Sequence, residues 1–433
     1  MIFYFLKRSI REPNYRKNLG ERLGFDNRVR TTKDPIWIHA VSLGEFRACV
    51  PLIRALLQRS EKVLLTTITP AGRNEAQKVF CSYINAKKIH LVYLPLEYDF
   101  AFYQFISRWR PRFVIILEYE LWPVMISSCT KYKIPLVLAQ GQYIEKSFLM
   151  DKKWPWFRGA LFNSFDLILA KSYIHKARYK FFCNNSVEVM GELRFDQEIS
   201  SDQIKSAEIF LKKTSLKKHS RLCFCFGSTG PGEDEILIAL MKRLNTNAIE
   251  RGMPKPFYIY VPRHEKSFLK ICQDLKKSGL NIIKRSEMLD KNLKLHDQHI
   301  DINDKIDGIL GDSLGEINFY FKISDYIFIG NSFNNLGSHN VIEPLALKKP
   351  VVVGPSVWGI EYPIVEAVEK GIIKIVETPD ELYEHWWYKI SRKDITPQND
   401  QSLRSFYNSH SGATRRCIKK LEQYGFLSKN EIN

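Results

Sequence analysis

The sequence predicts an α/β protein built from two successive doubly wound domains, each with a parallel sheet, and with a cleft between them. Short apolar segments of strand length alternate with helical segments along the chain. The alternation stops in a polar stretch near the middle of the chain and then starts again. The length of 433 residues also exceeds that of one ordinary domain.

The first domain is expected over residues 31–197. Its strand candidates are 35–41, 62–69, 89–95, 112–118, 135–141 and 167–172, with a last segment at 187–197. The segment after the first strand is predicted to be helical, because Ala48, Leu52, Leu56 and Leu57 recur at helical spacing. Apolar strands separated by helices indicate a parallel sheet that is covered on both faces.

The second domain is expected over residues 215–400, after a junction inside the polar stretch 198–221. Its strand candidates are 222–229, 257–264, 281–286, 326–332, 350–355 and 372–376. The loop-rich segment 294–316 is expected to hold one more strand, whose ends the sequence does not define. Residues 401–433 are predicted to form a helical tail of one or two amphipathic helices.

Composition limits the possible classes of protein. An apolar content of 45% with 13% aromatic residues excludes a mainly disordered chain. The formal net charge of +18 suggests an anionic partner, which could be nucleic acid, anionic lipid or a phosphorylated substrate. The eight cysteines lack metal-ligand spacing, and we interpret Cys223 and Cys225 as packing residues of a buried strand. Scattered thiols without a signal peptide indicate a reducing compartment.

The N-terminal segment, residues 1–30, combines an apolar start with basic residues. Five of the first six residues are apolar, and Lys and Arg then outnumber Glu. Such a segment suits the headgroup layer of an anionic membrane, but a frayed, solvated arm explains these residues equally well. The sequence contains no run of eighteen apolar residues, so it predicts no transmembrane helix.

Polar loops follow the predicted strands, at the sheet edge where doubly wound proteins bind their ligands. Ser42 and Gly44 open a helix after the first strand, and Glu45 lies in its first turn. Glu45 could act as a general base toward a hydroxyl, although its position alone favours a helix-capping role. Glu118 and Glu120 follow another strand and point to opposite sides of an extended chain, so they form no obvious acid–base pair.

The loops of the second domain combine glycines with polar side chains, a pattern that suits a nucleotide-type ligand. Glycine-rich backbone can approach a phosphate closely, and arginine can hold a phosphate with two hydrogen bonds. A glutamate early in a helix can accept both hydroxyls of a ribose. The candidate binding residues are Gly227, Ser228, Thr229, Arg263, His264, Gly315, Glu316, Gly337, His339, Asn340 and Glu343. Each loop alone could be a surface turn.

Taken together, these motifs resemble those of the 3-deoxy-D-manno-octulosonic acid (Kdo) transferases of Gram-negative lipopolysaccharide synthesis. The resemblance runs nearly end to end, through NYRKNLGERLG, WIHAVSLGEFRA, LEYELWPVMI, GELRFD, GSTGPGEDE, PRHEKSF, GDSLGE and GNSFNNLGSHNVIEPLALKKPVVVGP. The last stretch is the most specific. The resemblance implies the GT-B architecture, in which one Rossmann-like domain binds mainly the acceptor and the second binds the donor.

The resemblance also implies a reaction. The donor is expected to be CMP-Kdo and the acceptor the lipid A precursor, lipid IVA, with inversion at the anomeric carbon and no metal or other cofactor. Glu45 matches the general base of the family, and Ser42, Gly44, Glu118 and Glu120 match acceptor-side motifs. The candidate residues of the second domain match donor-binding motifs. A lipid acceptor further implies the cytoplasmic face of the inner membrane, reached peripherally or through an N-terminal anchor.

The chain departs from the family pattern in two places. Gln140 and Gln142 stand where family members more often show Asn and Arg, in a loop expected to shape the acceptor site. The number of Kdo residues transferred is therefore open. The apolar start is also shorter than the membrane anchor common in the family.

Three alternative interpretations remain at this level. The nearest is another sugar-nucleotide enzyme on the same fold, such as a UDP-sugar transferase or 2-epimerase. A nucleic-acid-binding protein would fit the positive charge, but the sequence shows no recognisable module, so we expect no nucleic-acid partner. A catalytically inactive scaffold is disfavoured because Glu45, Arg263 and Glu343 are all present.

Overall fold

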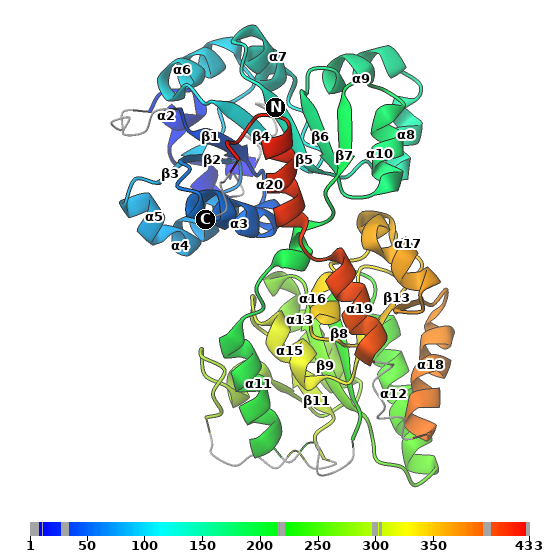
Figure 1. The fold of residues 1–433 in the computed structure, drawn as a ribbon. Helices are drawn as coiled ribbons and strands as arrows, with labels where there is room; N and C mark the ends of the chain where they lie inside the picture. Colours follow the sequence, from blue (N-terminus) through cyan, green and yellow to red (C-terminus); the bar gives the residue numbers. More distant parts are fainter. Residues whose placement is uncertain are drawn as a thin grey trace. The chain divides into compact units, whose positions relative to one another are not determined.

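The chain folds into two compact units. The computed structural model describes residues 8–10, 12–26, 34–214, 216, 221–296, 302, 305–392 and 400–429. One unit spans Met1–Gln197 with His410–Asn433, and the other spans Glu198–Ser409. In the described part of the chain, each unit contains one seven-stranded sheet whose paired strands are all parallel (Figure 1). The prediction of two doubly wound α/β domains is confirmed.

The sheet of the first unit reverses its chain order at one point. Its strands are β1 (Ile36–His39), β2 (Val63–Thr67), β3 (Ile89–Tyr93), β4 (Phe113–Leu117), β5 (Leu136–Gly141), β6 (Leu167–Ala170) and β7 (Ser186–Val189). They are ordered β3-β2-β1-β4-β5-β6-β7. The chain therefore leaves β1 in opposite directions, and the loops that follow β1 and β4 meet at this reversal, where doubly wound sheets bind ligands.

Helices cover both faces of this sheet. They are η1 (Pro13–Arg16), α2 (Leu19–Arg22), α3 (Leu43–Gln58), α4 (Pro70–Val79), α5 (Cys81–Asn85), α6 (Asp99–Trp109), α7 (Pro123–Lys131), α8 (Glu145–Asp151), α9 (Pro155–Phe162), α10 (Tyr173–Lys180), η2 (Leu193–Asp196) and α20 (Ala413–Gln423). Alternate strand residues pack on opposite faces: Ile36 and Ile38 join one apolar cluster and Trp37 the other. This explains why the strands are apolar along their whole length.

The C-terminal helix α20 belongs to the first unit. Ala413, Cys417 and Leu421 recur every four residues and join the same apolar cluster as α3. The backbone N–H groups of Gly412 and Thr414 donate to the Asp196 carboxylate, over 2.5 and 2.6 Å. Figure 1 shows this helix next to α3 rather than in the unit that precedes it in the sequence. The predicted helical tail is thus divided between the two units.

The second unit repeats the same sheet plan. Its strands are β8 (Cys223–Thr229), β9 (Phe257–Pro262), β10 (Ile282–Lys284), β11 (Gly308–Leu310), β12 (Tyr326–Ile329), β13 (Val351–Val353) and β14 (Ile373–Ile375). They are ordered β10-β11-β9-β8-β12-β13-β14, so the reversal lies between β8 and β12. The strand expected within 294–316 is β11. Cys223 and Cys225 are buried in β8, as their alternation predicted.

Helices also surround the second sheet. They are α11 (Ser201–Lys213), α12 (Asp234–Glu250), α13 (Glu265–Lys277), α14 (Arg285–Met288), α15 (Ile317–Ile323), α16 (Ile342–Ala346), η3 (Trp358–Ile360), α17 (Glu361–Glu369), α18 (Pro379–Ser391) and α19 (Asp400–His410). None of the helices in the described ranges is long and apolar enough to cross a membrane.

Part of the N-terminal segment packs on the first unit. Residues 1–7, 11 and 27–30, which include the apolar start, lie outside the described residues. The Glu21 carboxylate pairs with Arg73 over 2.6 Å and accepts from the Tyr93 N–H over 2.8 Å. The Arg22 side chain is 1% exposed and donates to the Ile68 carbonyl. Arg22 therefore contributes to neither a solvated arm nor a membrane contact.

Candidate functional site

The loop after β1 places Glu45 in a hydrogen-bonded helix cap. Ser42 is the N-cap of α3, and its Oγ accepts from the Glu45 N–H over 3.3 Å. The Glu45 carboxylate turns back and accepts from the Ser42 hydroxyl over 2.9 Å and from the Val41 N–H over 2.8 Å. Gly44 lies in the same first turn. Glu45 therefore has the capping role that its position predicted, and its side chain is fixed in one orientation.

The environment of Glu45 also disfavours its charge. The residue is only 7% exposed. Burial raises the pKa of Glu45 to about 8, and the negative charges of Glu118 and Glu120 act in the same direction, against the two hydrogen bonds of the cap. A carboxyl group with a pKa near neutrality is suited to general acid–base catalysis. The first unit thus brings together the three acids that the sequence singled out.

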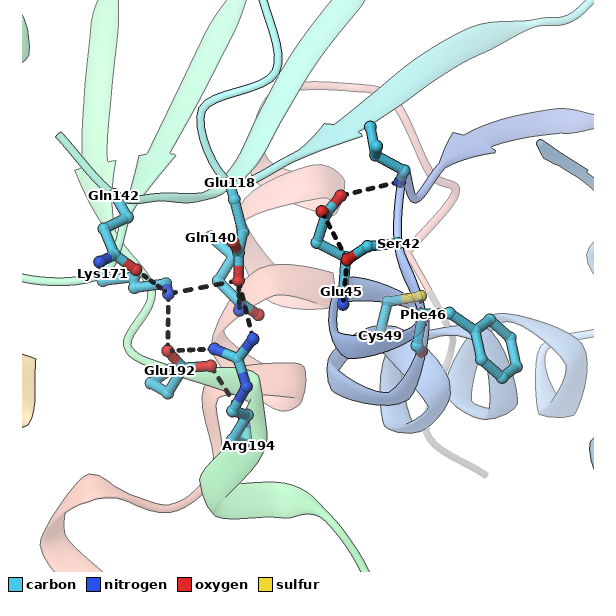
Figure 2. A network of polar contacts seen from close by, with 11 residues as sticks. Ser42, Glu45, Phe46, Cys49, Glu118, Gln140, Gln142, Lys171, Glu192 and Arg194 are labelled. Carbon is cyan, nitrogen blue, oxygen red and sulfur yellow. Dashed lines mark hydrogen bonds and ion pairs between the residues drawn. The ribbon is translucent and has the colours of Figure 1, made fainter. Parts of the chain in front are cut away.

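Glu118 lies at the end of β4 in a charge-balanced cluster (Figure 2). Its carboxylate contacts Arg194 at 3.0 Å and Lys171 at 3.6 Å. Glu192 contacts the same two cations, Lys171 at 2.8 Å and Arg194 at 3.2 Å. Burial acts to raise the pKa of Glu118, but Lys171 and Arg194 outweigh it and lower the value to about 2. Glu118 therefore stays ionised beside Glu45.

Glu120, two residues later, behaves differently. It is partly exposed, and burial together with the charge of Glu118 raises its pKa to about 7. The pKa values of Glu118 and Glu120 are therefore shifted in opposite directions. Three neighbouring carboxyl groups with pKa values of about 2, 7 and 8 can hold different protonation states at one pH.

The two glutamines that depart from the family pattern contact this cluster. Gln140, in the left-handed conformation with φ of 57°, donates from its amide to Glu118 over 3.2 Å. The Gln142 amide oxygen accepts from the Lys171 ammonium over 2.6 Å. The sequence analysis did not single out Lys171, Glu192 or Arg194. Glu192 and Arg194 lie in the quoted motif GELRFD. The only sequence feature that could have pointed to Lys171 is its position directly after a strand.

Three loops of the second unit meet at the carboxyl ends of β8, β9 and β12. Gly227 in β8 pairs with Ile329 in β12, and its carbonyl accepts from the Gly330 N–H over 2.9 Å. The Thr229 carbonyl accepts from the Arg263 N–H over 3.1 Å. Between them, Ser228 has a positive φ of 58°. The structure therefore brings the glycine loop, the Pro-Arg-His loop and the loop after β12 together.

Glu233 holds two of these loops in place. Its carboxylate is fully buried and accepts four backbone N–H groups, from Gly230 at 2.8 Å, Asn331 at 2.7 Å, Ser332 at 2.8 Å and Phe333 at 3.0 Å. Four such donors stabilise a buried carboxylate without a cation. The sequence analysis missed Glu233, although it lies in the quoted motif GSTGPGEDE.

Glycine is required where the loops touch. A Cβ on Gly330 would lie 2.6 Å from the Thr229 Cα, and one on Gly337 would lie 2.6 Å from the Trp358 ring. Gly337 also has a φ of 91°, which other residues rarely adopt. The glycines thus let the loops approach one another, a role that the sequence analysis had assigned only to ligand approach.

Cationic and imidazole groups gather beside these loops. Arg263 and His264 are exposed, and His339 is half-buried. Burial, together with the neighbouring Arg263 and His264, lowers the pKa of His339 to about 4. His339 is therefore neutral near pH 7. Its Nε2 is buried and has no hydrogen-bond partner in the described part of the chain.

The remaining candidates of the second unit lie at two helix starts. The Asn340 side chain accepts from the Ile342 N–H over 2.9 Å at the start of α16, and Glu343 lies in the first turn of that helix. Gly315 has a φ of 87°, and Glu316 after it pairs with Arg285 and accepts from the Ser313 hydroxyl. No group of three or more metal-ligating side chains is arranged to hold an ion in the residues that the structure describes.

Comparison with known proteins identifies the family. The family model described as 3-Deoxy-D-manno-octulosonic-acid transferase (kdotransferase) matches residues 17–197. The 3-deoxy-D-manno-octulosonic acid transferase of Bordetella pertussis is 30% identical over 395 residues, which cover 90% of this chain and 87% of the relative. The chain belongs to the 3-deoxy-D-manno-octulosonic acid transferase family. The Kdo transferase of Haemophilus influenzae is 28% identical, over 96% of this chain and 93% of the relative.

Solved structures support the fold of this Kdo transferase. A glycosyltransferase from Rickettsia africae matches with a TM-score of 0.54 and 15% identity, over 92% of this chain and 100% of the other. The UDP-GlcNAc 2-epimerase from Neisseria meningitidis matches with a TM-score of 0.54 and 14% identity, over 90% of this chain and 100% of the other. Together with the two parallel sheets, these matches confirm the GT-B fold class.

Proposed function

We propose that this Kdo transferase moves Kdo from CMP-Kdo to a hydroxyl of the lipid A precursor, with Glu45 as the general base. The observation that carries the proposal is the buried Glu45 carboxyl, held in a fixed orientation and with its pKa raised to about 8. A base of that pKa can take a proton from a hydroxyl as the oxygen becomes a nucleophile. Hydrogen bonds from Val41 and Ser42 aim the carboxylate without neutralising it.

The proposed step is a single displacement. The acceptor oxygen attacks the anomeric carbon of Kdo, its proton passes to the Glu45 carboxylate, and the bond from that carbon to the phosphate oxygen of CMP breaks. One displacement inverts the anomeric configuration. The cation Arg263 and the backbone N–H groups of the glycine loop would stabilise the negative charge on the departing CMP phosphate.

In this proposal the first unit binds the acceptor and the second binds the donor. Glu118 supports the base indirectly, because its negative charge helps to raise the pKa of Glu45. The Glu118 cluster itself has two acids and two cations in contact, so it offers no surplus charge to an acceptor phosphate. In the second unit, His339 and Asn340 lie near Arg263 and the start of α16, where Glu343 would accept the ribose hydroxyls of CMP.

A donor-competition assay tests the proposal. The purified protein receives lipid IVA and either CMP-Kdo, generated in situ, or UDP-GlcNAc, and the products are resolved by mass and their anomeric configuration by nuclear magnetic resonance. We expect Kdo addition from CMP-Kdo alone, with inverted configuration, and the mass ladder counts the sugars added. Turnover of UDP-GlcNAc without Kdo transfer would instead favour the sugar-nucleotide alternative on the same fold.

The proposed place of action is the cytoplasmic face of the inner membrane. A lipid acceptor with phosphates and acyl chains resides there, and the overall charge of +18 favours an anionic surface. Fractionation of cells that produce the protein, with a salt wash of the membranes, would test this location. Recovery in the soluble fraction at low salt would contradict it.

A further inference from the structure

A nine-residue segment of the first unit exposes most of its apolar side chains. From the end of α8 to the start of α9, the exposed fractions are 53% for Leu149, 61% for Met150, 63% for Trp154, 72% for Trp156 and 45% for Phe157. Isolated exposed apolar residues are ordinary in soluble proteins, but a contiguous patch marks an interaction surface. Neither the candidate acidic site nor the donor loops use these side chains.

The segment is held rigidly by a buried acid. Asp151 is 8% exposed and accepts from the hydroxyls of Tyr119, over 2.6 Å, and Tyr143, over 2.9 Å. It also pairs with Arg158 over 2.8 Å. Asp151 therefore ties the turn between α8 and α9 to the residues that follow β4 and β5, while the apolar side chains around the turn are exposed.

Positive charge surrounds the apolar side chains. Lys146, Lys152 and Lys153 are exposed, and the stretch 145–158 contains four basic residues against two acidic ones, of which Asp151 is buried. The Lys152 ammonium lies 4.6 Å from the ring centroid of Phe148 and 5.0 Å from that of Phe181, the C-cap residue of α10. Phe181 is 57% exposed, so an exposed apolar side chain also lies at the end of α10, the helix next to α8 in Figure 1.

We propose that this α8–α9 patch, residues 145–158 with Phe181, docks the protein on an anionic phospholipid bilayer. Tryptophan favours the headgroup level of a bilayer, where its ring is in an apolar layer and its N–H remains hydrated. Lysines beside it are attracted to the negative surface potential of an anionic leaflet. The combination of apolar rings and basic side chains is that of interfacial membrane segments.

A second copy of the chain fits the patch less well. Most homodimers place the same surface of both subunits face to face, which would bring Lys152 and Lys153 against their own copies. The proposal rests on the proposed function only in that a lipid acceptor explains why the enzyme would approach a membrane. Vesicle binding can be measured without any transfer.

Vesicle flotation of the full-length protein tests the proposal. Vesicles contain phosphatidylcholine alone or with phosphatidylglycerol. We expect the wild type to bind the anionic vesicles, Trp154→Ser/Trp156→Ser to lower partitioning by tenfold or more, and Lys152→Gln/Lys153→Gln to lower it on the order of tenfold at low salt. These side chains are exposed, so the variants are expected to fold.

Matched controls come from the second unit. Ile249 on α12 is 63% exposed, and Lys276 with Lys277 forms an exposed lysine pair at the end of α13. Ile249→Ser and Lys276→Gln/Lys277→Gln change the same properties elsewhere and are expected to bind vesicles like the wild type. If Lys276→Gln/Lys277→Gln lowers vesicle binding as much as Lys152→Gln/Lys153→Gln does, binding depends only on the overall charge, and the proposal is overturned.

Two other outcomes would also overturn it. If the tryptophan variant binds vesicles like the wild type, another segment makes the contact. If the wild type self-associates without vesicles, and the tryptophan variant is monomeric by sedimentation, the patch is an interface between copies. In contrast, a wild type that binds vesicles through the patch but transfers no Kdo would refute the proposed function and leave this proposal intact.

Discussion

Replacing Glu45 by glutamine should stabilise the protein, and more so at high pH. The pKa of Glu45 is about 8 in the folded protein against an ordinary value of 4.5. The folded state therefore holds this proton more tightly than the unfolded chain. Between pH 4.5 and 8 the unfolded chain loses the proton while the folded protein keeps it, so the free energy of unfolding falls as the pH rises. The stability contributed by the protonated form is complete below pH 4.5 and is lost as the pH rises to about 8.

The size of the effect follows from the two pKa values. Each pKa unit corresponds to 1.36 kcal/mol, so the cost is about 2 kcal/mol at pH 6 and about 5 kcal/mol at pH 9. Glu45→Gln has a similar shape but never ionises. The variant therefore does not lose unfolding free energy at either pH through the raised pKa, although it weakens the N-terminal cap of α3 by about 1 kcal/mol. The difference between pH 9 and pH 6, about 3 kcal/mol, does not depend on the cap.

The buried thiol of Cys49, one turn after Glu45, allows a local assay. Cys49 is fully buried in the folded protein. Urea unfolding is followed by alkylation and peptide mapping of Cys49 in wild type and variant, at pH 6 and pH 9. Thr69→Ala serves as the control, because Thr69 caps α4 in the same unit without a titrating group, over 3.1 Å to the Gly72 N–H. It should lower stability by about 1 kcal/mol at both pH values.

The reasoning fails if Glu45→Gln shifts the unfolding midpoint equally at pH 6 and pH 9. That result would mean that Glu45 is ionised in the folded protein throughout this range, as an ordinary capping glutamate is. The argument that burial and the neighbouring acids prepare Glu45 as a base would then be wrong.

Three further predictions concern the two clusters and the donor loops. Lys171→Met should lower the free energy of unfolding by about 3 kcal/mol in thermal or urea unfolding, because it leaves the buried Glu192 and the partly exposed Glu118 with one cation. Adding Glu192→Gln should recover part of this loss, and strict additivity of the two changes would contradict the prediction. Glu233→Gln replaces one acceptor oxygen by a donor facing N–H groups and should weaken CMP binding at least tenfold by calorimetry, whereas an unchanged affinity would show that the loops need no clamp. Arg263→Lys should raise the dissociation constant of CMP by about tenfold, since lysine cannot bind a phosphate through two parallel hydrogen bonds, and equal affinity would remove Arg263 from the phosphate site.

Most of the strands could be predicted because their physical cause is local. A strand buried on both faces is apolar along its length, and that pattern is visible without the fold. β11 (Gly308–Leu310) has only three residues in a polar stretch, so its ends could not be found from the sequence. In α20, the spacing of Ala413, Cys417 and Leu421 predicts an apolar face, but no local pattern says which unit that face covers.

The sequence predicted those site residues whose position directly after a strand is enough to place them. Glu45 and Glu118 follow strands that end at the same edge, and the sheet order brings them together. The partners of these acids were harder to find, since Lys171 follows β6 and contacts Glu118 only because of the order of the strands. Glu233 next to a glycine loop looks like an ordinary helix-start acid, and its four backbone partners lie mostly about a hundred residues away.

The measurement that tests the central claim most directly is the pH dependence of a single transfer. Wild type and Glu45→Gln are compared from pH 6 to pH 9 with CMP-Kdo and lipid IVA, and CMP binding is measured in parallel. We expect the wild-type rate to rise with pH and level off above about 8, and Glu45→Gln to lose at least a hundredfold in rate while binding CMP normally. A variant that transfers Kdo at a rate near that of the wild type would show that Glu45 is a helix cap and not the base.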